Sequence, residues 1–480
     1  MGSKLKVAGI LAVGVVAGAL TTMQLQAVAR NSMSPLPLEE VQQLAAVFDR
    51  VKSEYVEPVD EKKLISDAIA GMVAGLDPHS QYLDKKTFKE FRENTGGKFI
   101  GIGIEMGMED GLVKVVSPIE GSPAFRAGMK PGDLITRIDD TPVKGLTVDQ
   151  AVKKMRGEPG TKVMLTVFRK LESRSFPVTI VREEIRMQSV RANMPAPGYG
   201  WIRVSQFQDR TVDDFARKLD EIYKAEPNLK GLVLDLRNDP GGLLEASVAI
   251  SAAFLPADAL VVSTNGQIAD SKSVFKASPE YYQRRGGTDP LRKLPDAVKQ
   301  VPLIVLVNEG SASASEIVAG ALQDNKRAII MGAQTFGKGS VQTVRQLSPD
   351  TALKITTARY YTPSGASIQA KGIVPDVMLD ETAEGNLFAS LRVREADLEK
   401  HLQSGQGTEQ KNEAREKARE EARKKLEEET SKRAATPPKP LPEFGTPEDF
   451  QLAQAINRLK GKPVLVSKTL VERKPDTAIN

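Results

Sequence analysis

The feature that most constrains the fold is an alternation of apolar strands and helices between residues 184 and 385. Three stretches in this region are almost continuously apolar, and helix-forming stretches separate them. They are "GLVLDLR" (231–237), "VPLIVLV" (301–307) and "RAIIMG" (327–332). A strand that is apolar on both faces must be covered on both faces, which is typical of a largely parallel sheet between helices. We therefore predict an α/β core for residues 184–385.

Two regions precede this core. In residues 36–95, apolar side chains from Val41 to Tyr55 recur at three- and four-residue spacing, which predicts an N-terminal helical region. The stretch "GLDPHS" interrupts this pattern, and we assign its histidine, His79, a structural role rather than a catalytic one. In residues 96–183, short β-like runs such as "FIGIGIEM" alternate with Gly and Pro turns, which predicts a small β-rich module.

Two regions follow the core. Residues 386–445 contain a highly charged stretch with almost no large apolar side chain, followed by the Pro-rich "AATPPKPLP", which predicts a charged helix and a linker. Residues 446–480 predict an amphipathic helix and a tail, with Thr446 as the N-cap and an apolar face from Leu452 to Leu459. Such a short helix needs a partner surface, which is either its own core or a second subunit.

Composition excludes several kinds of chemistry. The chain has no cysteine, which excludes disulfides, thiol catalysis and cysteine metal sites. Two histidines among 480 residues make a zinc hydrolase site implausible, so we expect no metal and no cofactor. The formal net charge of +5 is too small to predict nucleic-acid binding.

The first 29 residues predict export. A basic start, "KLK", precedes the apolar "VAGILAVGVVAGAL" and the small-x-small pattern Ala27-Val28-Ala29, which is the layout of a secretory signal peptide. The alternative is an uncleaved membrane anchor from Val7 to Met23. Either way, we expect the folded part to face the outside of a bacterial inner membrane, in the periplasm.

A candidate nucleophile lies in "NEGSASASEIVAGALQD" (308–324), which follows an apolar strand. Ser313 and Glu316 form an S-x-x-E capping box, so a helix cap alone would explain this serine. The turn between a buried strand and a helix also suits a nucleophile, because backbone N–H groups there point at a developing oxyanion. The N–H of Ala314 is the natural donor.

The candidate base is a lysine. "GAQTFGKG" (332–339) resembles a phosphate-binding loop, but Gly339 replaces the Ser or Thr that would bind magnesium, and a strand-like stretch follows instead of a helix. We therefore reject nucleotide binding. Lys338 lies between two glycines and can be buried against backbone, which lowers the pKa of an ammonium and makes it a usable general base.

Several motifs together resemble the carboxyl-terminal processing proteases, also called tail-specific proteases. They are "GLDPHSQYL", "FIGIGIEM", "GLVLDLRNDPGG", "NEGSASASEIVAGALQD", "TFGKGSVQT" and "ARYYTPSGASIQAKGIVPD", and the likeness runs from about residue 38 to residue 380. The resemblance implies a multidomain α/β protein with a serine-protease core of crotonase-like type, an inserted PDZ domain at 96–183 and flanking helices.

The resemblance also implies site roles. Ser313 would be the nucleophile, Lys338 its base and Gln342 the residue that orients the lysine. The oxyanion would bind the N–H of Ala314 and an N–H of the Gly241–Gly242 turn, although those glycines also suit a plain strand-to-helix turn. Asp239 stands in "RNDPGG" where the family commonly has asparagine, and we expect no effect on the chemistry.

The β-rich module carries its own candidate site. "GIGIE" resembles the carboxylate-binding loop of a PDZ domain, in which a row of backbone N–H groups precedes an exposed strand edge. The alternative is a glycine-rich start of a strand. The second wall of the groove would be the helix "TVDQAVKKMRG". The candidate peptide-binding residues are Gly101, Ile102, Gly103, Ile104, Val148, Ala151 and Val152.

The leading interpretation is a periplasmic serine endopeptidase that selects substrates by their C-terminal tails. One alternative is a PDZ-based binding or scaffolding protein with an idle protease domain, and another is an acyl-CoA enzyme of related fold, which the export signal disfavours. The expected partners are proteins with exposed C-terminal tails. The resemblance adds a helical-repeat adaptor lipoprotein, and the terminal helices suggest a homo-oligomer.

Overall fold

The computed structural model describes residues 37–119, 121–283, 286–383, 385, 393–406, 424 and 442–467. The expected signal peptide and most of the charged segment lie outside these residues. The chain divides into two compact units, residues 1–72 and 73–480, which are described separately.

The described part of the first unit is helical, as predicted. Helix α2 spans Leu38–Glu54, and α3 spans Glu61–Ala74 and ends in the second unit. None of the residues of α2 is buried; of its predicted apolar face, Val41 and Leu44 are exposed and Phe48 and Val51 are half-buried. Among the helices that the structure describes, none has the length and hydropathy of a membrane span.

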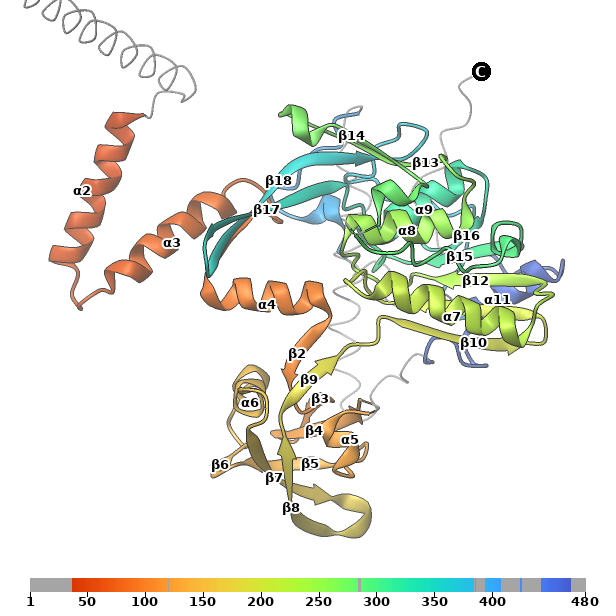
Figure 1. The fold of residues 1–480 in the computed structure, drawn as a ribbon. Coiled ribbons are helices and arrows are strands. Elements are labelled where there is room, and N and C mark those ends of the chain that lie inside the picture. The colour runs from red at the N-terminus through yellow and green to blue at the C-terminus, as the bar shows by residue number, and fades with distance from the viewer. Residues whose placement is uncertain are drawn as a thin grey trace, which may run out of the picture. The chain divides into compact units, whose positions relative to one another are not determined.

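A six-stranded sheet forms the centre of the second unit (Figure 1). Its order is β10-β11-β12-β15-β16-β19; β10 is an antiparallel edge strand, and the remaining neighbours pair in parallel. This confirms the predicted α/β core. The strands are β10 Val190–Ala196, β11 Tyr199–Val204, β12 Gly231–Asp235, β15 Leu303–Val307, β16 Ile329–Gly332 and β19 Val377–Met378.

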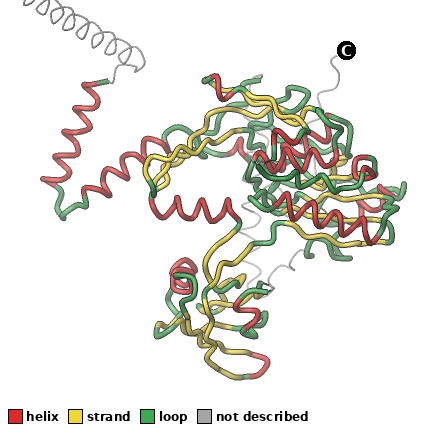
Figure 2. Tube along the Cα trace, in the orientation of Figure 1, coloured by secondary structure: helices red, strands yellow, loops and turns green. Residues whose placement is uncertain are grey.

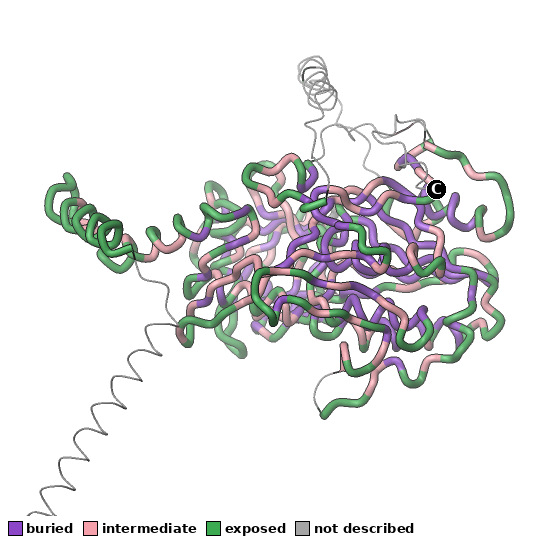
Figure 3. The backbone as a smooth tube through the Cα atoms, turned by 90° about the horizontal axis from the view of Figure 1, so that it is seen from above, coloured by how far each residue is buried: buried purple, intermediate pink, exposed green. Residues whose placement is uncertain are grey.

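The central sheet is covered on both faces, which explains its continuously apolar strands. Leu232 and Leu234 belong to a core with helices α7, α8 and α9, whereas Val233 belongs to a second core with α11 (Figures 1 and 3). Successive residues of a strand point to opposite faces, so one strand supplies both cores. The helices are α7 Thr211–Ala225, α8 Leu244–Phe254, α9 Ala314–Asp324 and α11 Phe450–Leu459.

The C-terminal helix begins later than predicted. Its N-cap is Asp449, whose side chain accepts from the N–H of Leu452 (3.1 Å), whereas the predicted cap, Thr446, lies in the preceding turn. Asp449 is fixed there because the guanidinium of buried Arg237 bonds to it at 2.6 and 2.9 Å. The partner surface of this helix is therefore its own core.

A second, antiparallel sheet lies beside the core. Its order is β1-β18-β13-β14, and β17 also pairs with β18. Strand β1 and helix α4, Lys85–Gly96, come from the region predicted to be only helical; β1 forms because Leu83 is buried against Phe88 and Ala352. The strands are β1 Gln81–Leu83, β13 Leu260–Gly266, β14 Ser273–Lys276, β17 Ser340–Ser348 and β18 Thr351–Tyr361.

The predicted β-rich module has its own sheet and core (Figure 2). Its sheet order is β3-β4-β5-β7-β8 with β6 on β5, and a separate β2–β9 pair joins it to the rest of the unit. The elements are β2 Lys98–Gly101, β3 Ile104–Glu109, β4 Leu112–Pro118, α5 Pro123–Arg126, β5 Leu134–Ile138, β6 Thr141–Pro142, α6 Val148–Met155, β7 Lys162–Arg169, β8 Arg174–Val181 and β9 Glu183–Arg186.

The run "FIGIGIEM" is two strands rather than one. It breaks at Ile102 and Gly103, because Gly103 has φ 78° and a Cβ there would lie 2.3 Å from the Cβ of Ser122. Only glycine adopts that backbone conformation readily and leaves room for Ser122.

Candidate active site

Ser313 lies in the turn between β15 and α9 in a backbone conformation that few residues adopt. Its φ of 56° and ψ of −112° lie outside the regions that residues with a Cβ populate, so the turn is strained. Strain of this kind is found at functional sites, where surrounding contacts hold it. Gly241 packs directly against this turn, since a Cβ there would lie 2.8 Å from the Cβ of Ser313.

Hydrogen bonding separates the three serines of "SASAS". Ser311 Oγ donates to Leu236 O (2.8 Å) and accepts from the N–H of Asn308 (2.9 Å), while Ser315 Oγ donates to Asp239 O (2.9 Å). Both side chains are fully buried. The Ser313 hydroxyl makes no hydrogen bond with the described residues. Ser311 and Ser315 therefore hold the fold, and Ser313 is the one available to react.

The capping interpretation of Ser313 is half right. The Glu316 carboxylate accepts from the backbone N–H of Ser313 (2.8 Å), which is one half of a capping box. The reciprocal half brings the backbone of Glu316 to the Ser313 side chain, but no hydrogen bond of normal geometry forms to the hydroxyl. The Ser313 hydroxyl is therefore only weakly engaged as a cap.

Glu316 joins the Ser313 turn to the lysine loop, a role that the sequence did not indicate. This fully buried carboxylate accepts four hydrogen bonds: Oε2 from the N–H groups of Ser313 (2.8 Å) and Lys338 (2.9 Å), and Oε1 from Thr335 Oγ1 (2.5 Å) and the N–H of Gly337 (2.7 Å). Because one oxygen binds both, the backbone nitrogens of Ser313 and Lys338 lie less than about 6 Å apart. Burial raises the pKa of Glu316 to about 7, although its donors oppose that shift.

The lysine loop requires its two glycines. Gly337 has φ 96°, and a Cβ on Gly339 would lie 2.2 Å from the backbone nitrogen of Gln369. Strand β17 follows at Ser340, which agrees with the rejection of a phosphate-binding loop, since no helix N-terminus is available there.

Lys338 is perturbed in the direction that a general base needs. Burial, with a smaller contribution from the nearby charge of Lys354, lowers the pKa of its ammonium to about 8, although the carboxylates of Glu395, Glu316 and Asp77 oppose the shift. About a tenth of Lys338 is therefore uncharged at pH 7, and about half at pH 8.

Gln342 lies on β17, close to the start of the strand. Its Nε2 donates to Ser340 Oγ (3.0 Å) and Thr356 Oγ1 (3.3 Å). Among the described residues, nothing donates to its amide oxygen. These two bonds fix the orientation of the amide, and the oxygen remains available to an ammonium group.

The candidate oxyanion donors are not equivalent. The N–H of Gly241 donates to Asp239 Oδ1 (2.8 Å), so it is already engaged. The N–H groups of Gly242 and Ala314 have no acceptor within the described part of the chain. Gly242 also has φ 146°, and a Cβ there would lie 2.0 Å from Phe207 O, so only glycine fits this turn. Gly242 and Ala314 are the two available donors.

Asp239 is a buried carboxyl beside this turn. Burial raises its pKa well above the usual range, and its Oδ2 has no hydrogen-bond partner among the described residues. A protonated carboxyl is neutral and nearly isosteric with the asparagine amide, so this residue holds Gly241 as an asparagine would.

The predicted peptide loop is partly core. Ile102 is buried in the module's core, and its C=O accepts from the N–H of Ala124 (2.9 Å). The C=O of Gly103 accepts from Ser122 Oγ (2.9 Å). By contrast, the N–H groups of Ile102 and Gly103 donate to no described acceptor, and β3 begins at Ile104 as the edge strand of its sheet. These N–H groups are available to a carboxylate.

The other predicted groove residues differ in exposure. Gly101 ends β2 and is buried, and Ala151 is buried in the module's core. Neither residue is therefore available to line the groove. Val148 is exposed and Val152 is half-buried on α6, so both remain available to a ligand.

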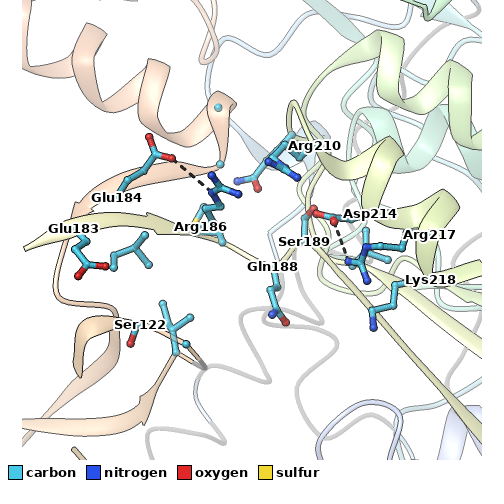
Figure 4. Close-up of a pocket in the computed structure, with 18 of the residues that line it drawn as sticks. Ser122, Glu183, Glu184, Arg186, Gln188, Ser189, Arg210, Asp214, Arg217 and Lys218 are labelled. Atoms are coloured by element: carbon cyan, nitrogen blue, oxygen red, sulfur yellow. Dashed lines mark hydrogen bonds and ion pairs between the residues drawn. The ribbon is translucent and has the colours of Figure 1, made fainter. Parts of the chain in front are cut away.

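Two cavities border this module but do not contain the nucleophile or base. One, of about 580 Å³, lies between β9 and α7 and is lined by polar side chains, including the ion-paired Glu184 and Arg186 and the pair Asp214 and Arg217 (Figure 4). The other, of about 1040 Å³, contacts Ile104 at the start of β3. No cluster of His, Asp and Glu among the described residues could hold a metal ion.

Family models match three parts of the chain. Peptidase family S41 matches residues 198–379, the PDZ domain matches residues 101–180, and the N-terminal domain of the activating protease CtpB matches residues 13–87. The first match covers most of the α/β core, and the second covers most of the β-rich module.

Known proteins align over most of the chain. A carboxy-terminal-processing protease of Bartonella bacilliformis is 42% identical over 363 residues, which are 75% of this chain and 80% of the relative. A probable CtpA-like serine protease of Staphylococcus aureus is 39% identical over 339 residues, 70% of this chain and 64% of the relative. The solved photosystem II D1 C-terminal processing protease is 31% identical, with a TM-score of 0.41, over 69% of this chain and 86% of its own.

Replacement of the three serines by alanine should have different effects on activity and on stability. Ser313→Ala should reduce cleavage of an unfolded reporter protein by about a thousandfold or more, because it removes the nucleophile. Ser311→Ala and Ser315→Ala should keep activity within about tenfold and lower the free energy of unfolding by about 1–2 kcal/mol, because each strips a donor from a buried carbonyl. Steady-state kinetics and urea unfolding measure both. A folded Ser311→Ala or Ser315→Ala that is inactive beside an active Ser313→Ala would overturn the assignment.

Proposed function

Because this chain belongs to the carboxy-terminal-processing proteases of peptidase family S41 and carries a PDZ domain, we propose that it cleaves proteins with a dyad of Ser313 and Lys338. The observation that carries the proposal is the shared Glu316 oxygen, which holds the N–H groups of both residues. An unbonded serine hydroxyl, a strained turn and a lysine with a lowered pKa support it. None of these features would be needed by a scaffold whose protease domain is idle.

The proposed reaction has two steps. Neutral Lys338 takes the proton of Ser313 as its Oγ attacks the scissile carbonyl, and the negative oxygen is stabilised by the N–H groups of Gly242 and Ala314. The Lys338 ammonium then protonates the leaving amine, which leaves an acyl-enzyme and a neutral lysine. In the second step Lys338 takes a proton from water, the hydroxide attacks the ester, and the proton returns to Ser313. Throughout, the amide oxygen of Gln342 would orient the lysine.

We extend the proposal to recognition of substrate C-termini by the PDZ domain. The unpaired N–H groups of Ile102 and Gly103 would bind the terminal carboxylate, and the free edge of β3 would pair with the tail as an added strand. Val148 and Val152 on α6 are placed to contact an apolar side chain of that tail.

For localisation we propose the periplasm, on the sequence of residues 1–29. Cell fractionation followed by N-terminal sequencing tests this: a start near Arg30 in the periplasmic fraction is expected, and a cytoplasmic protein that retains Met1 would contradict it. The adaptor lipoprotein and the homo-oligomer stay predictions.

Replacement of Lys338 should abolish activity even when the charge is kept. Arginine cannot lose its proton in a protein, so Lys338→Arg should lose about a thousandfold or more in kcat/KM, like Lys338→Ala. The exposed Lys299→Arg is the matched control and should be unaffected. For wild type, activity should fall as the pH drops below about 8, where Lys338 becomes protonated, and level off above it. A folded Lys338→Arg with substantial activity would rule out the dyad.

The PDZ domain should distinguish a free carboxylate from an amide. Full-length protein carrying Ser313→Ala, which cannot consume the ligand, is titrated with a peptide ending in valine and with its C-terminally amidated twin. The free peptide should bind at least about tenfold more tightly, because charge-assisted hydrogen bonds to the loop are lost on amidation. Calorimetry or fluorescence anisotropy measures both affinities, and equal values would remove carboxylate capture from the proposal.

A further inference from the structure

The turn "GLDPHS" (75–80), which lies outside the region matched by the protease family model, is linked to the lysine loop through a histidine and Glu395. His79 Nε2 lies 2.7 Å from Glu395 Oε2, and the two residues are 316 positions apart in the chain. Glu395 is fully buried, whereas His79 retains some exposure. A buried carboxylate with one histidine partner is a costly arrangement unless it serves the surrounding structure.

Glu395 connects to both sides of Lys338. Its backbone N–H donates to Phe336 O (3.1 Å), before the lysine. Its Oε1 accepts from Gln369 Nε2 (2.8 Å), and Gln369 Oε1 accepts from the N–H of Gly339 (3.0 Å), after the lysine. The His79–Glu395 pair therefore supports the loop that presents the base through contacts other than those of Glu316.

The same turn also reaches the glutamine. Asp77 Oδ1 accepts from Thr356 Oγ1 (3.1 Å), and Thr356 Oγ1 accepts from Gln342 Nε2 (3.3 Å). Asp77 Oδ2 accepts from Ser80 Oγ (2.6 Å), which holds the turn closed. Two residues of one short turn are thus linked, through Glu395 and Thr356, to the base loop and to the residue proposed to orient the base.

The charges around Lys338 come from four elements. Lys354 on β18 disfavours the ammonium, whereas Glu395, Glu316 on α9 and Asp77 favour it. His79 Nε2 occupies one oxygen of the Glu395 carboxylate, one of these three acidic groups. Two charged residues lie next to Glu395 in the chain: Arg394 Nη2 donates to Lys371 O (2.7 Å), and Asp397 Oδ2 accepts from the N–H of Arg394 (2.8 Å).

We propose that His79 is a positioning residue of this protease, which holds the lysine loop through Glu395 and shields the Lys338 amine from the Glu395 carboxylate. The inference rests on the proposed serine–lysine dyad. It assigns a residue at the end of the N-terminal helical region to the chemistry of the core, although His79 touches neither substrate nor the reacting atoms.

The test is the pH dependence of kcat/KM for an unfolded reporter protein. The acid limb is the pH range over which kcat/KM rises as Lys338 loses its proton. His79→Ala exposes Lys338 to the full charge of Glu395, so the midpoint of this limb should move upward by about one pH unit. The value of kcat/KM should then fall about tenfold at pH 7 and recover at high pH. Glu395→Gln alone should move the limb downward, and adding it to His79→Ala should reverse the upward shift. The matched control is His401→Ala, whose ring bonds to the backbone of Leu398 and should leave the limb in place.

The outcomes separate the two proposals. A wild-type enzyme without a limb near pH 8, or an active Lys338→Arg, would mean that the dyad itself is wrong. A wild-type limb that His79→Ala leaves unmoved, with activity lost equally at every pH, would reduce His79 to a structural residue and overturn the inference. If His79→Ala does not fold, Glu395→Gln decides, since an unmoved limb there removes the electrostatic link.

Discussion

A single buried carboxylate holds the reactive parts of this protein together. Glu316 takes backbone N–H groups from the nucleophile turn and from the lysine loop, which lie on different segments of the core. The strained backbone at Ser313 costs about 1–3 kcal/mol. When Glu316 is ionised, a hydrogen bond to it contributes about 1.5–3 kcal/mol, so the bond from Ser313 is large enough to offset that strain. Because burial raises the pKa of Glu316 to about 7, this support weakens as the pH falls below 7. The geometry of the site therefore depends on a group that takes no part in the proposed reaction.

The charge state of the base is a balance between opposing effects. Burial and one neighbouring lysine push Lys338 toward the neutral form, and three carboxylates push it back. The resulting pKa of Lys338 lies near neutral pH, so the exposure or neutralisation of one neighbouring carboxylate appreciably changes the fraction of Lys338 that is uncharged. The same carboxylates also position the loop, so geometry and charge at this site are not independent.

The sequence predicted what is encoded locally. Continuously apolar strands required a sheet covered on both faces, and short contiguous motifs located Ser313, Lys338 and Gln342. What it missed depends on contacts between distant residues: the second role of Glu316 across the lysine loop, the His79–Glu395 pair, and the bond from Arg237 that moves the start of α11 to Phe450. The split of "FIGIGIEM" was missed for a different reason, since it follows from the positive φ of one glycine and the position of Ser122.

The buried ion pair between Arg237 and Asp449 has a consequence for how the chain folds. Arg237 follows β12 directly, yet its partner lies 212 positions later, and so does the helix that covers the second face of the sheet. As the chain emerges from its N-terminal end, that apolar face and its arginine stay uncovered until the residues up to 459 have followed. Contacts this distant close slowly. Folding intermediates of this protein therefore expose the uncovered half of their own core, where premature pairing or a chaperone can compete with α11.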